Sequence, residues 1–122
     1  MTVVSLISLA VGLIALGLPF AVLESKGVVP NGAAIVWVRE VGVLLLALGT
    51  IAFAIRKHQD SSTLRAFLIG NAIVHAGLLP IEIIAFAQGV ITKASGIIPN
   101  SVLHVVMTFA FLYYARRIGR PH

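Results

Sequence analysis

Long apolar segments alternate with short polar segments along the whole chain. The apolar segments cover about residues 3–23, 33–55, 64–88 and 101–115, and the first of them contains no charged residue. A helix needs roughly 20 mostly apolar residues to cross a bilayer. The pattern therefore predicts an all-α integral membrane protein with four helices, formed by a single domain over residues 1–122.

The polar segments between them carry turn-forming residues. Residues 24–32 are rich in glycine and proline, and residues 59–63 form a polar tract, so we expect a loop at each place. Residues 89–100 are predicted to form a further loop. Ser62 or Thr63 is expected to cap the helix that follows the polar tract, because serine and threonine oxygens accept from the free N–H groups of a first turn.

Small residues and prolines modify two of the predicted helices. Ser5, Ser8 and Gly12 share one face of the first helix, which allows a neighbouring backbone to approach closely. Pro19 is expected to kink the last turn of that helix. Pro80 lies inside the third helix and frees a backbone carbonyl there, which also favours a kink.

Composition supports the membrane assignment. The chain is 59% hydrophobic and 11% charged, and its mean hydropathy is +1.05. Soluble domains carry about 25% charged residues. The net charge of +5 comes without a basic run interleaved with aromatics, so no nucleic-acid partner is expected. The absence of cysteine excludes disulfides and thiolate metal sites.

Basic residues are distributed unevenly between the two predicted sides of the membrane. One side has Arg56, Lys57, Arg65, Arg116, Arg117 and Arg120, and the other has Lys26, Arg39 and Lys93. Lysine and arginine concentrate on the cytoplasmic side of membrane proteins. We therefore expect both termini in the cytoplasm. The first apolar segment lacks a basic start and a small-residue cleavage site, so we interpret it as a retained helix.

Isolated polar side chains interrupt the later apolar segments, and they are the candidate functional residues. They are Arg39, Glu40, Asn71, His75, Glu82 and His104. Such groups are costly inside a bilayer, so each needs a partner, a cavity or a function. From the rise per residue, Arg39, Glu40 and Glu82 lie about 10 Å from the outer ends of their helices, and His75 lies about 10 Å deeper than Glu82.

Helical periodicity arranges these residues in two stripes. One stripe has Asn71, His75 and Glu82, and the other has Ser101, His104 and Thr108. At 100° per residue the first three lie within about 40° of one another. Polar stripes that face lipid are implausible, so we expect both to point inward, toward each other and toward Arg39 or Glu40.

The residue types in these stripes fit general acid–base chemistry. We predict His75 and Glu82 as a catalytic pair, with Arg39, Glu40, Asn71 and His104 binding the ligand. A glutamate and a histidine in a buried site can exchange protons near neutral pH. The expected ligand is a lipophilic small molecule, isoprenoid-like or quinone-like, undergoing isomerisation, cyclisation or hydrolysis.

Simpler structural roles are open for the same residues. Arg39 can pair with Glu40 or Glu82, or extend outward to the membrane surface. Asn71 can join helices by a hydrogen bond, and His104 can bond a carbonyl near the start of its helix. Ser101 is expected to act as a cap. Thr108 is expected to bond the backbone of its own helix.

Metal and nucleotide sites have no sequence signature here. His75, Glu82, His104 and Glu40 offer metal-ligand side chains, but neither HxxxH nor HxxE spacing occurs, so no metal site is predicted. GxxxxGK, GxGxxG and GxSxG are also absent. The sequence identifies no cofactor.

Three stretches resemble the DoxX-like group of small bacterial four-helix membrane proteins. They are WVREVGVLLLALGTIAFAIR, LRAFLIGNAIVHAGLLPIE and SVLHVVMTFAFLYYARR. Arg39, Gly42 and Gly49 match the group's Arg-x-x-Gly followed by a leucine-rich run and another glycine, and Asn71 with His75 is similar to its uncharacterised members. The resemblance implies a four-helix up-down bundle in a bacterial inner membrane. Some members are linked to quinone-dependent oxidation, but this chain has no cysteine or cofactor motif to support a redox role.

Two other functions compete with the ligand-binding hypothesis. One is proton-coupled transport by a homodimer, although the predicted first helix lacks the acidic residue on which small multidrug transporters rely. The other is an accessory or structural role in a larger membrane complex, for which the small-residue face of the first helix is suited. In that case the polar residues only hold helices together.

Overall fold

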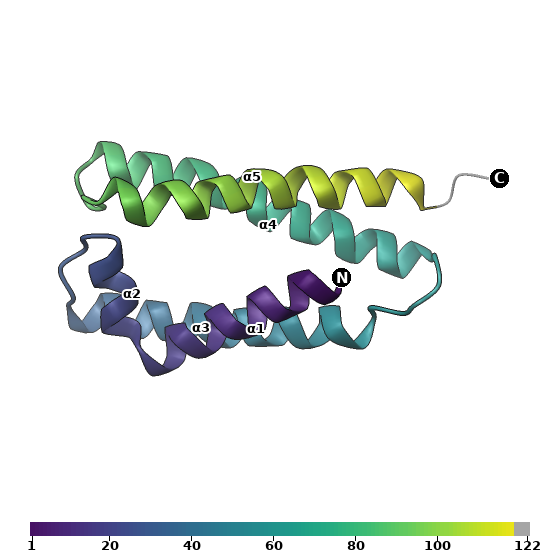
Figure 1. Ribbon diagram of the computed structural model, residues 1–122, viewed down its shortest axis with the longest axis horizontal. Coiled ribbons are helices and arrows are strands. Elements are labelled where there is room, and N and C mark those ends of the chain that lie inside the picture. Colours follow the sequence, from purple (N-terminus) through teal and green to yellow (C-terminus); the bar gives the residue numbers. More distant parts are fainter. Residues whose placement is uncertain (119–122) are drawn as a thin grey trace. The chain divides into compact units, whose positions relative to one another are not determined.

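The computed structural model describes residues 1–118, and these residues form helices and connecting turns without any strand. The helices are α1 (Thr2–Gly17), α2 (Pro19–Ser25), α3 (Gly32–Ala54), α4 (Ser62–Ala87) and α5 (Ala94–Arg117) (Figure 1). The predicted all-α class is confirmed. Arg120, which contributed to the predicted orientation, lies outside the described residues.

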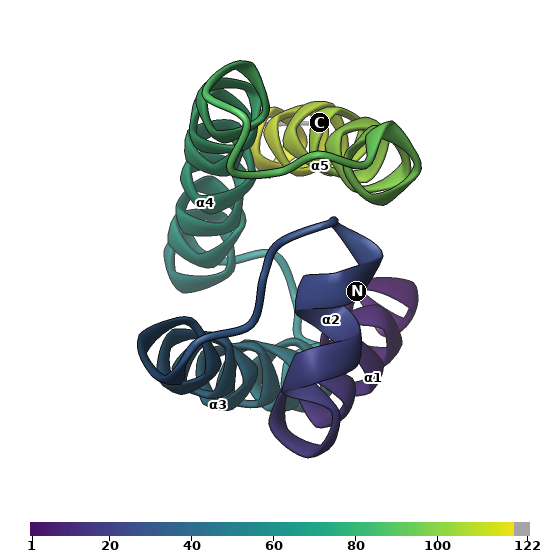
Figure 2. The same ribbon diagram turned by 90° about the vertical axis from the view of Figure 1, so that its left-hand side faces the viewer.

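Two compact units make up the chain, Met1–Lys57 and His58–His122. In the first unit α1 packs along α3, and in the second α4 packs along α5, as the view in Figure 2 shows for each pair. The assembly of the helices into one up-down bundle stays a prediction.

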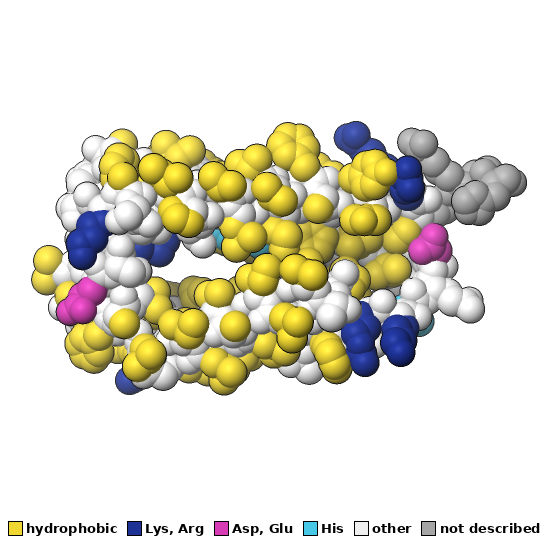
Figure 3. Space-filling view, viewed as in Figure 1, with side chains coloured by type: hydrophobic (Ala, Val, Ile, Leu, Met, Phe, Trp, Pro, Cys, Tyr) yellow, Lys and Arg dark blue, Asp and Glu magenta, His cyan; other side chains and the backbone are white. Residues whose placement is uncertain are grey.

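Three helices are long and apolar enough to cross a membrane. They are α3, α4 and α5, with 23, 26 and 24 residues, and α1 with α2 is a fourth if this bent pair counts as one span. Hydrophobic side chains cover the visible lengths of the helices, while charged side chains gather toward the helix ends (Figure 3). The chain is a multi-pass membrane protein.

The predicted first helix is broken rather than kinked. The helix expected over residues 3–23 ends at Gly17, and Pro19 begins α2 at an angle of 105° to α1. Proline has no N–H to continue the helical hydrogen bonds, and its ring disfavours a helical conformation at the preceding residue. Leu18 accordingly has φ −129° and ψ 50°, outside the helical region.

Side-chain caps set the starts of α3 and α4. The Asn31 Oδ1 accepts from the Ala34 N–H at 2.9 Å, and the Ser61 Oγ accepts from the Leu64 N–H at 3.1 Å. The cap of α4 is therefore Ser61, and the prediction of Ser62 or Thr63 is wrong by one or two residues. Both helices lie within two residues of their predicted bounds.

Replacing Ser61 with alanine is expected to lower the free energy of unfolding by about 1 kcal/mol, the usual cost of losing an N-cap. Thermal unfolding followed by far-ultraviolet circular dichroism in detergent measures the change. Ser62→Ala is the matched control, because Ser62 lies one residue further on and is the first residue of the helix rather than its cap. Equal destabilisation by both variants would contradict the assignment of the cap.

The last helix starts earlier than its sequence suggests. Residues 94–100, predicted as part of a loop, form the first two turns of α5, and Pro99 lies inside the helix. Ile97, in these turns, is buried, and burial of apolar surface offsets the hydrogen bond that proline cannot donate. Ser101 therefore lies within α5, and the prediction that it caps the helix is wrong.

Glycines bring α1 and α3 together in the first unit. A Cβ atom on Gly12 would lie 2.9 Å from the Gly42 carbonyl oxygen, and one on Gly49 would lie 2.9 Å from the Leu9 Cγ. Ser5 is fully buried on the same side of α1, and its hydroxyl donates to the Thr2 carbonyl at 2.8 Å. The close approach predicted for this small-residue face is confirmed.

Candidate acid–base site

Two histidines meet where α4 packs against α5. The Nδ1 atoms of His75 and His104 lie 2.8 Å apart, which is a hydrogen-bond distance, and their ring centroids are 5.0 Å apart. His75 also stacks against the Phe111 ring, with ring centroids 5.6 Å apart and an interplanar angle of 22°. The predicted convergence of these stripes is therefore observed for His75 and His104.

Glu82 lies at the other end of the same polar cluster. The Asn100 amide nitrogen donates to its Oε1 atom, and the Ser101 hydroxyl donates to its Oε2 atom at 3.2 Å. The Asn100 Nδ2 also lies 3.1 Å from the Nε2 of His104. A continuous hydrogen-bonded chain therefore runs from Glu82 through Asn100 and His104 to His75, and we call these four residues the polar chain.

The antiparallel course of α4 and α5 explains this register. Residues 88–93 connect the two helices, so positions near the end of α4 face positions near the start of α5. Glu82 accordingly faces Asn100 and Ser101, while His75, two turns earlier, faces His104. The catalytic pair predicted from sequence, His75 and Glu82, is linked through two intervening side chains.

Burial differs among the polar side chains. His104 retains 8% of its exposure, whereas His75 and Glu82 are half-buried. Asn71 is also buried, but its amide donates to the Phe67 carbonyl of its own helix at 2.9 Å. Thr108 bonds the His104 carbonyl at 2.8 Å, which confirms the predicted bond to its own helix.

Two of the predicted ligand-binding residues, Arg39 and Glu40, lie in the first unit. Arg39 and Glu40 are exposed on α3, and within the described residues 1–57 neither side chain has a hydrogen-bond or ion-pair partner. Their participation in the site stays a prediction.

Asn100 is the functional candidate that the sequence analysis missed. The sequence predicts a loop over residues 89–100, and a loop gives the Asn100 side chain no defined direction. The available signal was its spacing from His104, because residues four apart lie on one face of a helix. Extending the last helix across Pro99 would have put Asn100 and Ser101 beside the predicted stripe.

Hydrogen bonding accounts for the arrangement of these side chains. Among residues 1–118, no group of three or more histidines and carboxylates is placed to hold a metal ion. An imidazole can both donate and accept a hydrogen bond, and a carboxylate can bind or release a proton. The polar chain thus has the components of an acid–base site inside two membrane-spanning helices.

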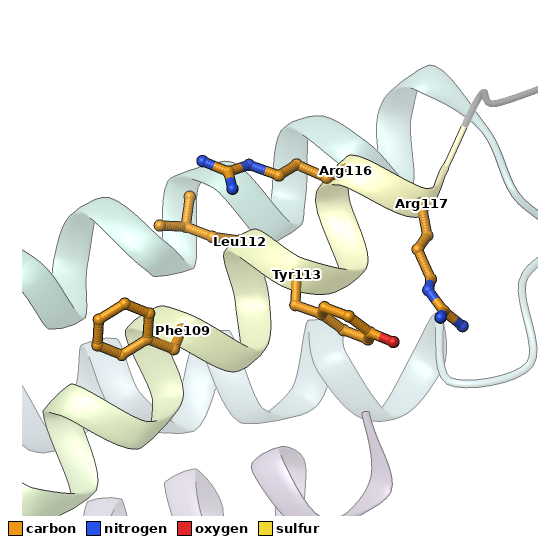
Figure 4. Close-up of a pocket in the computed structure, with 5 residues that line it drawn as sticks. All are labelled: Phe109, Leu112, Tyr113, Arg116 and Arg117. Carbon is orange, nitrogen blue, oxygen red and sulfur yellow. The ribbon is translucent and has the colours of Figure 1, made fainter.

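A surface hollow occurs elsewhere on α5. It is lined by Phe109, Leu112, Tyr113, Arg116 and Arg117 (Figure 4). The guanidinium carbon of Arg117 lies 4.7 Å from the centre of the Tyr113 ring. None of the polar-chain residues lines this hollow, which belongs to the C-terminal part of α5. It is therefore separate from the candidate acid–base site.

Comparisons of the chain with protein-family models, with curated proteins and with solved structures gave no match.

Proposed function

We propose that this protein binds or transforms a lipophilic small molecule by acid–base chemistry, at the polar chain between α4 and α5. The observation that carries this proposal is the unbroken series of hydrogen bonds from Glu82 to His75. Ionisable groups within membrane spans are rare and commonly mark substrate or proton pathways. Here a carboxyl group and two imidazoles are connected through hydrogen bonds. Joining two helices requires only a single hydrogen bond, so the longer series favours a chemical role.

The length of the polar chain supports a site with distinct ends. Glu82 and His75 are seven residues apart on α4, which corresponds to about 10 Å along the helix axis. Asn100 and His104 occupy the interval and hold the orientation of the end groups. His75 is the end that contacts the ligand in this proposal, because its ring is half-buried while His104 is almost fully enclosed.

The chemistry of the ligand follows from the surface through which it arrives. Large apolar side chains are exposed on both helices of this unit, among them Val74 and Ile81 on α4 and Val105 on α5. A molecule that diffuses in the bilayer meets these side chains before it reaches His75. We therefore propose an isoprenoid-like or quinone-like ligand, with Asn71 supporting the site.

The membrane setting is part of the same proposal. The resemblance to the DoxX-like group supports a bacterial inner membrane. The excess of basic residues around the connection between α3 and α4 and at the C-terminus supports cytoplasmic termini. A homodimer or a larger membrane complex is compatible with this arrangement.

Native mass spectrometry of the protein, purified gently from its own membranes, tests the proposal. The wild-type protein is expected to carry a discrete bound mass, and His75→Ala is expected to lose it because the contacting imidazole is removed. Ile73→Ala is the matched control, since this neighbouring side chain is 67% exposed and takes no part in the polar chain. A ligand-free wild-type protein, or full retention of the bound mass by His75→Ala, would refute the proposal.

A further inference from the structure

The hydrogen bonds of the polar chain have a direction that begins at Glu82. Its two carboxylate oxygens face two donors, the amide nitrogen of Asn100 and the hydroxyl of Ser101. Carboxylate oxygens accept hydrogen bonds, so both oxygens of Glu82 are acceptors here. The Asn100 side chain is thereby oriented with its NH₂ group toward the carboxylate.

Asn100 passes this direction to His104. Its amide nitrogen carries two hydrogens, of which one points to Glu82 and the other to the His104 Nε2 at 3.1 Å. That ring nitrogen must then accept, so it carries no hydrogen. A neutral imidazole has one N–H, and in His104 it is therefore at Nδ1.

His104 in turn determines the state of His75. The His104 Nδ1–H donates across 2.8 Å to the Nδ1 of His75, which must be unprotonated to accept it. The hydrogen of His75 is consequently on Nε2. Within residues 1–118 this nitrogen has no hydrogen-bond partner. Every buried side-chain nitrogen or oxygen among these residues has a partner, so Nε2 is not buried and is accessible at the surface of the α4–α5 pair.

We infer that His75 acts as a hydrogen-bond donor through its Nε2–H, and that the ligand is a lipophilic molecule with a carbonyl oxygen that accepts this bond. The inference rests on the proposed function and specifies the ligand class of the same site. Asn100 is a positioning residue, because it determines which nitrogen of each histidine carries the hydrogen. A carbonyl oxygen suits this site because it can only accept.

Solid-state ¹⁵N NMR of the full chain in lipid bilayers, with labelled histidines, tests the inference without a ligand. Protonated and unprotonated imidazole nitrogens have well-separated ¹⁵N shifts, so each tautomer is read directly. The four histidines of the chain are assigned by substituting them singly. We expect the Nδ1–H form for His104 and the Nε2–H form for His75.

Variants at the start of the α5 stripe test the role of Asn100. Asn100→Asp replaces the amide donor with a carboxylate, which only accepts when it is ionised, so the hydrogen of His104 is then expected to move to Nε2, and that of His75 to Nδ1. Ser101→Ala is the matched control, because it removes the other donor to Glu82 but leaves Asn100 and both rings in place. The tautomers in this control are expected to equal those of the wild type.

Several outcomes would overturn the inference. An Nε2–H form of His104 in the wild-type protein would overturn it, and this result does not require the variants to fold. Unchanged tautomers in Asn100→Asp would also overturn it. A bound molecule that lacks a carbonyl oxygen would refute the ligand class. Because the NMR measurement needs no ligand, its failure is distinguishable from a failure to find any bound mass by native mass spectrometry.

Discussion

The Gly12→Ala variant is expected to lower the free energy of unfolding of the Met1–Lys57 unit by about 2 kcal/mol, within the usual range for overpacking. The added Cβ atom would lie 2.9 Å from the Gly42 carbonyl oxygen and 3.0 Å from two side-chain carbons of Leu46. A backbone oxygen cannot rotate away as a side chain can, so α1 must shift from α3. The shift loses packing along a contact that depends on small residues.

Titration of the full chain with sodium dodecyl sulfate in mixed micelles measures this effect. Trp37, the one tryptophan in the sequence, lies on α3, so its fluorescence reports on this unit. Gly17→Ala is the matched control, because a Cβ atom there meets nothing within 4 Å. The control is expected to be neutral or slightly stabilising, since alanine favours the helix. Equal destabilisation by both variants would show that the interhelical contact is not responsible.

Replacing His104 with leucine is expected to lower the free energy of unfolding of the second unit by about 2 kcal/mol. Leucine keeps an apolar side chain in this buried position but leaves the Asn100 Nδ2 and the His75 Nδ1 each without one partner. His75→Leu is expected to cost about 1 kcal/mol, because it breaks one hydrogen bond at a half-exposed position. The loss of His104 should therefore lower the free energy of unfolding more than the loss of His75.

Far-ultraviolet circular dichroism during the same detergent titration compares the two variants. His58→Leu provides the control, since this histidine is exposed and lies outside the helices. A double variant of His75 and His104 should cost less than the two single changes combined, because both remove the same hydrogen bond. Additive effects, or a smaller effect at His104 than at His75, would contradict the continuous chain.

Much of the helical framework was predictable because turn chemistry and hydropathy agree there. Asn31 precedes one apolar segment, and the polar tract with Ser61 precedes another, so α3 and α4 were placed to within two residues. The two larger errors involve prolines. Pro19 ends a helix where only a kink was expected, and Pro99 lies inside a helix where a loop was expected. Packing decides between these outcomes, and local sequence does not contain that information.

The candidate site was also predictable only in part. Polar residues in apolar segments identified His75, Glu82 and His104 correctly as members of one cluster, because helical periodicity fixes the face on which each lies. Asn100, which links these residues, was missed. The last helix was predicted to begin at residue 101, so helical periodicity could not assign Asn100 to a face. Helical periodicity cannot specify ion pairs that depend on the packing of separate units, such as the one predicted between Arg39 and Glu82.

The break before Pro19 leaves α1 shorter than the hydrocarbon core of a bilayer is thick. With 16 residues, α1 rises about 24 Å, whereas the hydrocarbon core is about 30 Å thick. The neighbouring α3, with 23 residues, rises about 35 Å. The two helices packed together in this unit therefore match different bilayer thicknesses. Such hydrophobic mismatch makes the N-terminal unit sensitive to acyl-chain length, which vesicles of graded thickness would reveal.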